Sequence, residues 1–118
     1  MNPIRVCIIG TGGIARAHLE ALKQAGEKVR VLAASDVDRE RVEAFCRELG
    51  IPRAYTDNAK MLAVEKPGLV HICTPPATHC ELSVQCLESG AWAFCEKPLC
   101  GSLAEMDRIE AAEKKTGR

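Results

Sequence analysis

The sequence predicts an α/β fold, a doubly wound parallel sheet with helices on both faces in a single three-layer domain over residues 1–118. Short apolar runs typical of buried strands alternate along the chain with segments whose apolar residues recur at helical spacing. Such alternation gives parallel strands joined by right-handed crossovers. A length of 118 residues suits one domain with a real core, and not two ordinary ones.

The charge of the chain argues against two classes of partner. Lys and Arg total 16 and Asp and Glu total 16, so the formal net charge is zero. Binding to nucleic acid or to a membrane surface needs a surplus of basic residues, so we expect neither partner. No basic run precedes an apolar stretch of 18 residues. We therefore expect no signal peptide and no transmembrane segment, and we predict a cytoplasmic protein.

The seven cysteines include no C-x-x-C pair, and several lie within apolar strand patterns. In a chain without a secretion signal, we interpret them as reduced, small buried hydrophobic residues. A metal site at His79 and Cys80, or at Cys95 and Cys100, is the alternative. Neither pair has the paired ligand spacing of metal sites, so we expect no metal.

The first strand, residues 4–9, runs directly into Gly10-Thr11-Gly12-Gly13-Ile14-Ala15, and a helix follows that ends at Gly26. A G-x-G-x-x-A sequence between a strand and a helix is typical of dinucleotide-binding domains of the Rossmann type. Gly10 permits the tight turn, Gly12 lets the backbone approach a pyrophosphate, and Ala15 keeps the helix close to the strand. The start of the helix offers N–H groups to the phosphates. A tight turn without a ligand is the alternative.

The second strand, residues 29–34, is followed by an acidic residue, Asp36. In a dinucleotide-binding domain, a carboxylate at this place accepts hydrogen bonds from the adenosine ribose hydroxyls. A carboxylate also repels a 2′-phosphate, so Asp36 favours NAD over NADP. Arg39 and Arg41 could bind such a phosphate, which keeps NADP open. Asp36 could instead be a turn residue, but Asp38 is the better helix N-cap, so we expect Asp36 to be free for a ligand.

The later elements follow the same alternation, and each is delimited by a glycine, a proline or a capping residue. The expected elements up to the middle of the chain are a helix from Asp38 to Gly50 with Val42, Phe45, Cys46 and Leu49 inward, a brief strand within residues 51–55, and a short helix capped by Thr56 or Asp57 and ended by Pro67-Gly68. The remaining ones are a strand over 69–73, a helix over 77–89, a strand over 92–95, and a last helix that opens on the capping box Ser102-Leu103-Ala104-Glu105, with Met106 and Ile109 inward.

Two histidines lie within these elements. We interpret His18 as a partly exposed residue of the first helix, and His71 as a strand residue near the end of the sheet.

Two polar segments follow buried strands at the carboxyl edge, where open α/β sheets bind their ligands. The segment after residues 69–73 is Thr74-Pro75-Pro76, with His79 three residues later. Its two prolines fix the backbone and remove N–H donors, which gives a stiff wall. The segment after residues 92–95 is Glu96-Lys97-Pro98. Two adjacent charges at this place are either ligand-binding groups or a solvated strand end.

Four segments together resemble the glucose–fructose oxidoreductase, inositol dehydrogenase and rhizopine-catabolism (Gfo/Idh/MocA) family. They are the glycine turn of residues 10–15, Ser35-Asp36-Val37-Asp38, Cys73-Thr74-Pro75-Pro76 with His79, and Cys95-Glu96-Lys97-Pro98-Leu99. The similarity covers essentially the whole chain, and the E-K-P motif with an upstream T-P-P…H is far more specific than the glycine motif. The resemblance implies an NAD(P)-dependent oxidoreductase that acts on CH–OH groups of sugars, cyclitols or related polyols.

The resemblance also implies a role for each matched residue. Gly10, Thr11, Gly12, Gly13, Ile14 and Ala15 would hold the pyrophosphate, and Asp36 would hold the adenosine ribose. Thr74, Pro75, Pro76 and His79 would line the path of the cofactor toward the nicotinamide ribose, and Glu96 would contact that ribose. Lys97 would be the catalytic residue, placed between nicotinamide and substrate, where a cationic ring and partial desolvation would bring its pKa below the usual ~10.4. In this family the bond corresponding to Lys97–Pro98 is often cis.

Members of the family continue into a second α/β domain that forms the substrate pocket, usually makes the oligomer contact and supplies further acid/base residues. We expect no such C-terminal substrate domain within residues 1–118. We therefore expect the NAD(P)-binding domain of a longer oxidoreductase, which is not catalytically competent alone and could form homo-oligomers. One alternative is a non-catalytic module that binds or senses NAD(H). Another is a scaffold that binds nothing and associates through an exposed edge strand.

Overall fold

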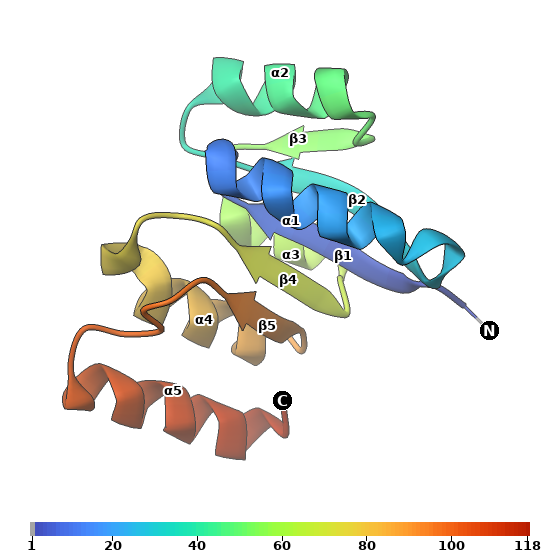
Figure 1. Cartoon of the computed structure of the whole chain (residues 1–118). Helices are drawn as coiled ribbons and strands as arrows, with labels where there is room; N and C mark the ends of the chain where they lie inside the picture. Colours follow the sequence, from blue (N-terminus) through green and yellow to red (C-terminus); the bar gives the residue numbers. More distant parts are fainter. Residues whose placement is uncertain (1) are drawn as a thin grey trace.

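The computed structural model describes residues 2–118 and contains one sheet of five parallel strands (Figure 1). The strand order is β3-β2-β1-β4-β5, the predicted doubly wound arrangement. The strands are β1 (Ile4–Ile9), β2 (Val29–Ser35), β3 (Arg53–Tyr55), β4 (Leu69–Ile72) and β5 (Trp92–Cys95). The helices are α1 (Gly13–Gln24), α2 (Arg39–Leu49), α3 (Asn58–Glu65), α4 (His79–Glu88) and α5 (Leu103–Thr116). Short 3₁₀ turns, Gly26–Lys28 and Pro76–Thr78, precede β2 and α4.

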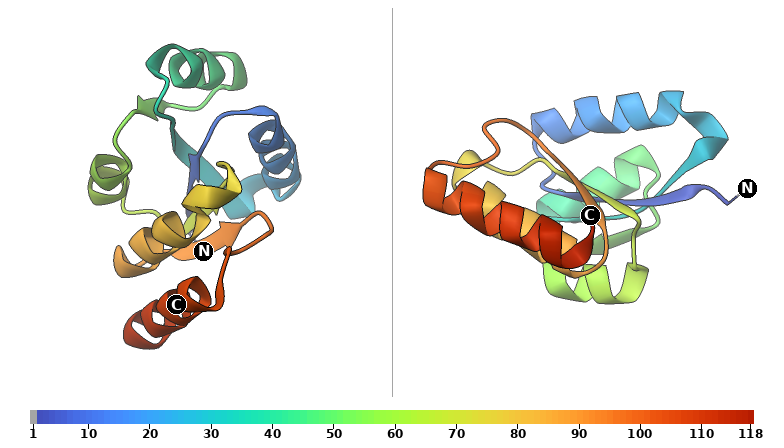
Figure 2. Two further views of the ribbon diagram at one scale, coloured as in Figure 1. Left: turned by 90° about the vertical axis from the view of Figure 1, so that its left-hand side faces the viewer. Right: turned by 90° about the horizontal axis from the view of Figure 1, so that it is seen from below.

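Helices cover both faces of the sheet (Figures 1 and 2). On one face Ile8 of β1 packs in a core cluster with Leu19 of α1 and Phe45 of α2. On the other face Ile9 of β1 packs with Met61 of α3 and with residues of α4. Successive side chains of β1 therefore point into opposite cores, which explains why this strand is an uninterrupted apolar run. The predicted three-layer architecture is confirmed.

The last helix, α5, packs against α4, as Figure 2 shows. Its buried residues Ile109 and Ala112 meet Cys80 and Leu87 of α4. Met106 was expected to face inward but is 38% exposed, so that expectation is wrong. Because α5 contacts one helix, its buried stripe is narrower than the stripe of a helix that lies on a sheet.

The predicted N-caps are confirmed. Asp38 caps α2, Asp57 caps α3 and Ser102 caps α5, each by accepting a hydrogen bond from the backbone N–H three residues later. The capping box at α5 differs in one detail. The Glu105 carboxylate accepts a hydrogen bond from the N–H of Gly101, at 2.7 Å, and not from the N–H of the cap residue itself.

Five of the cysteines are buried: Cys7, Cys46, Cys73, Cys80 and Cys86. Burial raises the pKa of the Cys7, Cys73 and Cys86 thiols to about 12, so they behave as small apolar groups at neutral pH. Among residues 2–118, no three His, Cys, Asp or Glu side chains are grouped to hold a metal ion. In the same part of the chain no helix combines the length and the apolar character needed to cross a membrane.

Candidate functional site

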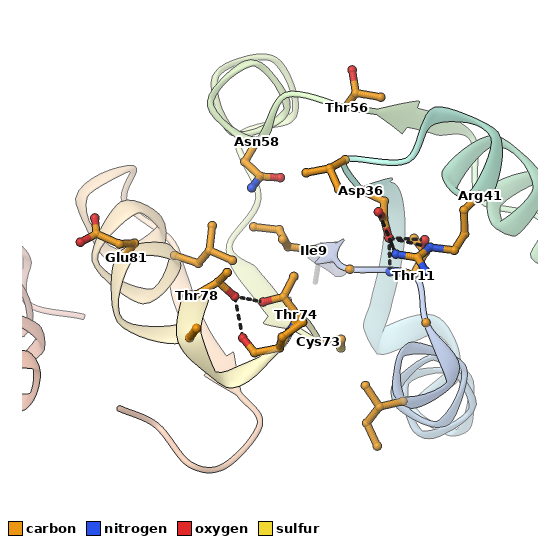
Figure 3. Close-up of a pocket in the computed structure, with 17 residues that line it drawn as sticks. Ile9, Thr11, Asp36, Arg41, Thr56, Asn58, Cys73, Thr74, Thr78 and Glu81 are labelled. Atoms are coloured by element: carbon orange, nitrogen blue, oxygen red, sulfur yellow. Dashed lines mark hydrogen bonds and ion pairs between the residues drawn. The ribbon is translucent and has the colours of Figure 1, made fainter. Parts of the chain in front are cut away.

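A cavity of about 820 Å³ opens at the carboxyl ends of β1, β2 and β4. Figure 3 shows Asp36, Arg41 and Thr11 on one side of it and Thr74 and Thr78 on the other. Its lining residues are Ile9, Gly10, Thr11, Gly12, Ile14, Asp36, Val37, Arg41, Thr56, Asn58, Cys73, Thr74, Pro75, Ala77, Thr78, Glu81 and Leu82. The glycine turn, the acidic residue after β2 and the proline-containing segment after β4 thus meet around one space.

The glycine turn forms the floor of this cavity between β1 and α1. Gly10 has φ +94°, a backbone conformation that is strained for any residue with a side chain. A Cβ placed there would also lie 2.8 Å from the carbonyl carbon and oxygen of Cys73, which is too close. The Gly10 N–H donates to the carbonyl of Ser35 at 2.8 Å, which ties the turn to the end of β2. Gly12 caps α1 without any side-chain hydrogen bond to the first turn. A Cβ at Gly12 or Gly13 would meet nothing within 4 Å, so both glycines border open space.

Asp36 is buried at the end of β2 and is surrounded by donors. Its carboxylate accepts hydrogen bonds from the N–H and hydroxyl of Thr11, at 3.0 and 2.7 Å, and from the N–H of Asp38 at 3.0 Å. The Arg41 guanidinium adds Nε at 3.2 Å and Nη2 at 3.1 Å. Burial raises the pKa of Asp36, but the hydrogen bonds from Thr11, Asp38 and Arg41 outweigh that effect and bring it to about 2. Asp38 and not Asp36 caps α2, as expected, but the Asp36 carboxylate is already engaged by donors of the protein, which a buried carboxylate needs.

The opposite wall is a turn held by hydroxyl groups. The Thr78 hydroxyl donates to the carbonyl of Pro75 at 2.7 Å, so the Thr74 hydroxyl is the donor to Thr78 at 2.6 Å. Behind this wall lies His79, which is 1% exposed. Its Nε2 faces the carbonyl of Thr74 at 2.8 Å and its Nδ1 faces the carbonyl of Pro98 at 2.6 Å. His79 therefore connects the segment after β4 with the segment after β5.

The segment after β5 lies beside the cavity and outside its lining. Glu96 accepts a hydrogen bond at 2.5 Å from Nε2 of His18, which lies in α1. His18 is 7% exposed, so the expectation of a partly exposed helix histidine is wrong. The side of α1 that carries His18 rests on β4 and β5, where the ring contacts His71 and Phe94. Lys97 is exposed, and the Lys97–Pro98 peptide bond is cis, as the resemblance implied.

Residues 4–118 match a family model named GFO_IDH_MocA and described as "Oxidoreductase family, NAD-binding Rossmann fold". The chain belongs to the Gfo/Idh/MocA family. Its residues form the NAD-binding Rossmann domain of that family.

Relatives of the chain include dehydrogenases named for myo-inositol and for D-apiose. A myo-inositol 2-dehydrogenase of Thermotoga maritima is 34% identical over 95% of this chain, which corresponds to 33% of the relative. A D-apiose dehydrogenase of Paraburkholderia graminis is 34% identical over 93% of this chain and 29% of its own length. The crystal structure of the WlbA dehydrogenase of Chromobacterium violaceum, in complex with NADH and UDP-GlcNAcA, superposes with a TM-score of 0.94 at 25% identity, covering all of this chain and 34% of that one. The chain thus spans about a third of the length of these proteins.

The structure of this Gfo/Idh/MocA domain divides the predicted site residues into two groups. Those that line the cavity are Gly10, Thr11, Gly12, Ile14, Asp36, Thr74 and Pro75. Those that lie outside its lining are Gly13, Ala15, Pro76, His79, Glu96 and Lys97. Ala15 is fully buried against β1, in keeping with its predicted packing role.

Sequence reasoning missed four polar residues of the cavity, namely Thr56, Asn58, Thr78 and Glu81. Asn58 stands at the start of α3 and accepts a hydrogen bond from the Ser35 hydroxyl at 2.6 Å. The position of Thr56 directly after β3 was the available signal, because the carboxyl ends of parallel strands share one edge of the sheet.

Proposed function

We propose that a dinucleotide occupies the cavity at the carboxyl ends of β1, β2 and β4, with NAD preferred over NADP. We further propose that the chain is the cofactor half of an oxidoreductase that acts on CH–OH groups of cyclitols or sugars. One observation carries the proposal, the convergence of the glycine turn, Asp36 and Thr74-Pro75 on the same cavity. A glycine turn for the pyrophosphate and an acidic residue for the adenosine ribose are the parts by which Rossmann domains bind a dinucleotide, and the wall at Thr74-Pro75 would lie along the nicotinamide end.

The cavity fits such a ligand at two places, the start of α1 and the end of β2. At the start of α1 no side chain caps the helix, and Gly12 and Gly13 border open space, so the backbone N–H groups could bind the two phosphates. Gly10 to Ile14 would follow the pyrophosphate. At the end of β2 the Asp36 carboxylate is ionised at neutral pH because its pKa is about 2. The ribose hydroxyls would donate to Asp36 in place of Arg41, whose side chain is 55% exposed and can turn away.

The nicotinamide end would extend along Thr74 and Pro75 toward the segment after β5. When bound there, NAD supplies an acceptor for a hydride from the substrate carbon. Glu96 would accept a hydrogen bond from the nicotinamide ribose, and Lys97 would orient the substrate hydroxyl and assist its proton transfer. Pro76 and His79 would support the wall from behind. The two ring nitrogens of His79 face the carbonyls of Thr74 and Pro98, one in each segment.

The substrate class rests on the relatives, which are named as dehydrogenases of myo-inositol and D-apiose. Because the chain spans about a third of their length, the substrate pocket would come from residues outside this chain. Homo-oligomer formation and a cytoplasmic location stay predictions.

Titration with NADH, and separately with NADPH, tests the proposal by following nicotinamide fluorescence. We expect NADH to bind more tightly than NADPH, and we expect Asp36→Ala to lose or invert this preference. Asp38→Asn is the matched control, because Asp38 caps α2 through its side chain and lies outside the cavity lining. Equal binding of the two dinucleotides would remove the NAD preference. Absence of binding by protein with a cooperative unfolding transition would overturn the proposed function.

A module that binds or senses NAD(H) without catalysis is the second candidate. It is favoured by the position of Glu96 and Lys97 outside the cavity lining. The two candidates differ in what Lys97→Met does in a protein that also carries a substrate domain. Loss of turnover with unchanged NADH affinity supports the enzyme, and unchanged behaviour supports the module.

A further inference from the structure

Three polar side chains from distant parts of the sequence form a hydrogen-bonded chain beside the cavity. His71 of β4 contacts His18 of α1 through their Nδ1 atoms, 2.8 Å apart. His18 Nε2 contacts Glu96 Oε1 at 2.5 Å. Both histidines are 7% exposed, and the Glu96 side chain is 34% exposed. This series of hydrogen bonds therefore runs from the core to the surface of the site.

The direction of each hydrogen bond follows from the acceptor at its end. A carboxylate only accepts, so Nε2 of His18 carries the hydrogen that is shared with Glu96. In a neutral ring Nδ1 of His18 is then an acceptor, and Nδ1 of His71 must be the donor. Burial lowers the pKa of His71 to about 4, with the neighbouring His18 as a second cause, so His71 is neutral near pH 7. Each donor then faces one acceptor, from His71 through His18 to Glu96.

Aromatic packing restricts the rotation of both rings. Phe94 stacks on His71 with ring centroids 4.8 Å apart and an interplanar angle of 19°. His18 stands edge-on to His71, with centroids 5.1 Å apart at 85°, and edge-on to Phe94, at 5.6 Å and 78°. The N–H that points at Glu96 is thereby held in one direction before any ligand binds.

The hydrogen bond to Glu96 also connects the two ends of the proposed dinucleotide site. His18 lies in the second turn of α1, the helix that begins at the glycine turn. Glu96 directly follows β5 and precedes Lys97. Of the residues that the structure describes, His18 is the one that bonds to the Glu96 carboxylate, and it uses Oε1. Oε2 therefore remains for another donor.

We propose that His18 is a positioning residue that fixes Oε1 of Glu96 and so presents Oε2 to a hydroxyl of the nicotinamide ribose, while His71 sets the tautomer of His18. This inference rests on the proposed function, since it assumes that a dinucleotide occupies the cavity. It adds two residues to the site that the motifs do not contain.

The test compares three ligands that share the adenosine end: NADH, ADP-ribose and ADP. Only NADH and ADP-ribose carry the second ribose. We expect His18→Leu to weaken both of them about tenfold, as for loss of a hydrogen bond to a charged group, and to leave ADP affinity within about twofold. His18→Gln should restore most of the affinity, because its amide can donate to Glu96 and accept from His71. Leu22→Ala is the matched control, a buried truncation in the same helix that should leave the ratio of NADH to ADP affinity unchanged.

The outcomes separate this inference from the proposed function. If the wild-type protein is folded and binds none of the three ligands, the proposed function is overturned and this inference with it. If wild type binds NADH and His18→Leu keeps the same ratio of NADH to ADP affinity, His18 has no positioning role although the cavity is the cofactor site.

A second measurement applies even where His18→Leu does not fold. Nitrogen-15 NMR of the histidine rings of the wild-type protein should show a hydrogen on Nε2 of His18 and none on its Nδ1. Glu96→Gln should shift the Nε2 resonance. A His18 ring that averages between tautomers and ignores Glu96→Gln would overturn the inference.

Discussion

The Arg41 guanidinium lies against the Asp36 carboxylate, with Nε 3.2 Å and Nη2 3.1 Å from the same oxygen, Oδ2. Asp36 is buried, whereas the Arg41 side chain is 55% exposed. The arginine therefore acts as a movable cover over a fixed carboxylate at the place where the adenosine ribose is proposed to bind. Without Arg41 the Asp36 carboxylate still accepts hydrogen bonds from Thr11 and Asp38, so removal of the arginine should change ligand preference more than folding.

Arg41→Ala should increase the preference for NADH over NADPH by about tenfold. The substitution removes the competitor of the ribose hydroxyls at Asp36 and also removes a cation that could bind a 2′-phosphate, and we scale the effect from one hydrogen bond to a charged group. Parallel fluorescence titrations with both dinucleotides measure the ratio. Arg47→Ala, an exposed substitution near the other end of α2, should leave it unchanged. A fall in the ratio for Arg41→Ala would show that Arg41 assists NADH binding instead.

Gly10→Ala and Gly12→Ala should separate folding from binding. At Gly10 the φ of +94° and the contact at 2.8 Å with the Cys73 backbone predict a loss of about 3 kcal/mol in the free energy of unfolding. At Gly12 the backbone lies in a region open to alanine, with φ −79°, and the added Cβ meets nothing. Gly12→Ala should therefore unfold like wild type in urea and still bind NADH several-fold more weakly, because the methyl group enters the proposed pyrophosphate path. Equal NADH affinity in folded Gly12→Ala protein would contradict that path.

The buried His71 should make the protein less stable in mild acid. Its ordinary pKa is 6.5 and burial lowers it to about 4, so between these values the unfolded chain binds more protons than the folded chain. Stability therefore falls as the pH falls from 6.5 toward 4, by about 3 kcal/mol at the lower end. Urea unfolding at a series of pH values measures the slope.

His71→Asn is the variant that isolates this contribution to the pH dependence. An asparagine amide can still donate to His18 but does not titrate. We expect the loss of stability between pH 6.5 and 4 to be clearly smaller in this variant. An unchanged slope would assign the acid sensitivity to other groups.

Much of the fold could be predicted because its signals are local. The apolar run of β1, Gly10 after it and Asp38 before α2 each act on neighbours within a few residues, and the structure confirms all three. Met106 was misplaced because the width of a buried stripe depends on what the helix packs against. That partner, α4, lies elsewhere in the sequence.

The hydrogen bonds that join His71, His18 and Glu96 could not be predicted from the sequence, for the same reason. Glu96 and His18 are 78 residues apart, and His18 and His71 are 53 residues apart. Neither contact follows from periodicity, since a histidine on a helix has the same local pattern whether it faces solvent or a strand end. The engagement of Asp36 by Thr11 also depends on how the glycine turn sits against β2.

Thr11→Val should reveal how much of this carboxylate network stabilises the fold. The substitution keeps the shape of the side chain and removes the hydroxyl that donates to Asp36 at 2.7 Å, leaving a buried carboxylate with one donor fewer. We expect a loss of about 1–2 kcal/mol in the free energy of unfolding at pH 7.

The hydrogen bonds lower the pKa of Asp36 from 3.8 to about 2. Their contribution to the free energy of unfolding is therefore complete above the pKa of the unfolded state and declines as the pH falls toward 2. The gap between wild type and variant, measured by urea unfolding, should therefore narrow from pH 5 to pH 3. Thr11→Ser, which keeps the hydroxyl, should behave like wild type over the same range. A gap that is equally wide at pH 3 would mean that the Thr11 hydroxyl stabilises the turn independently of the charge on Asp36.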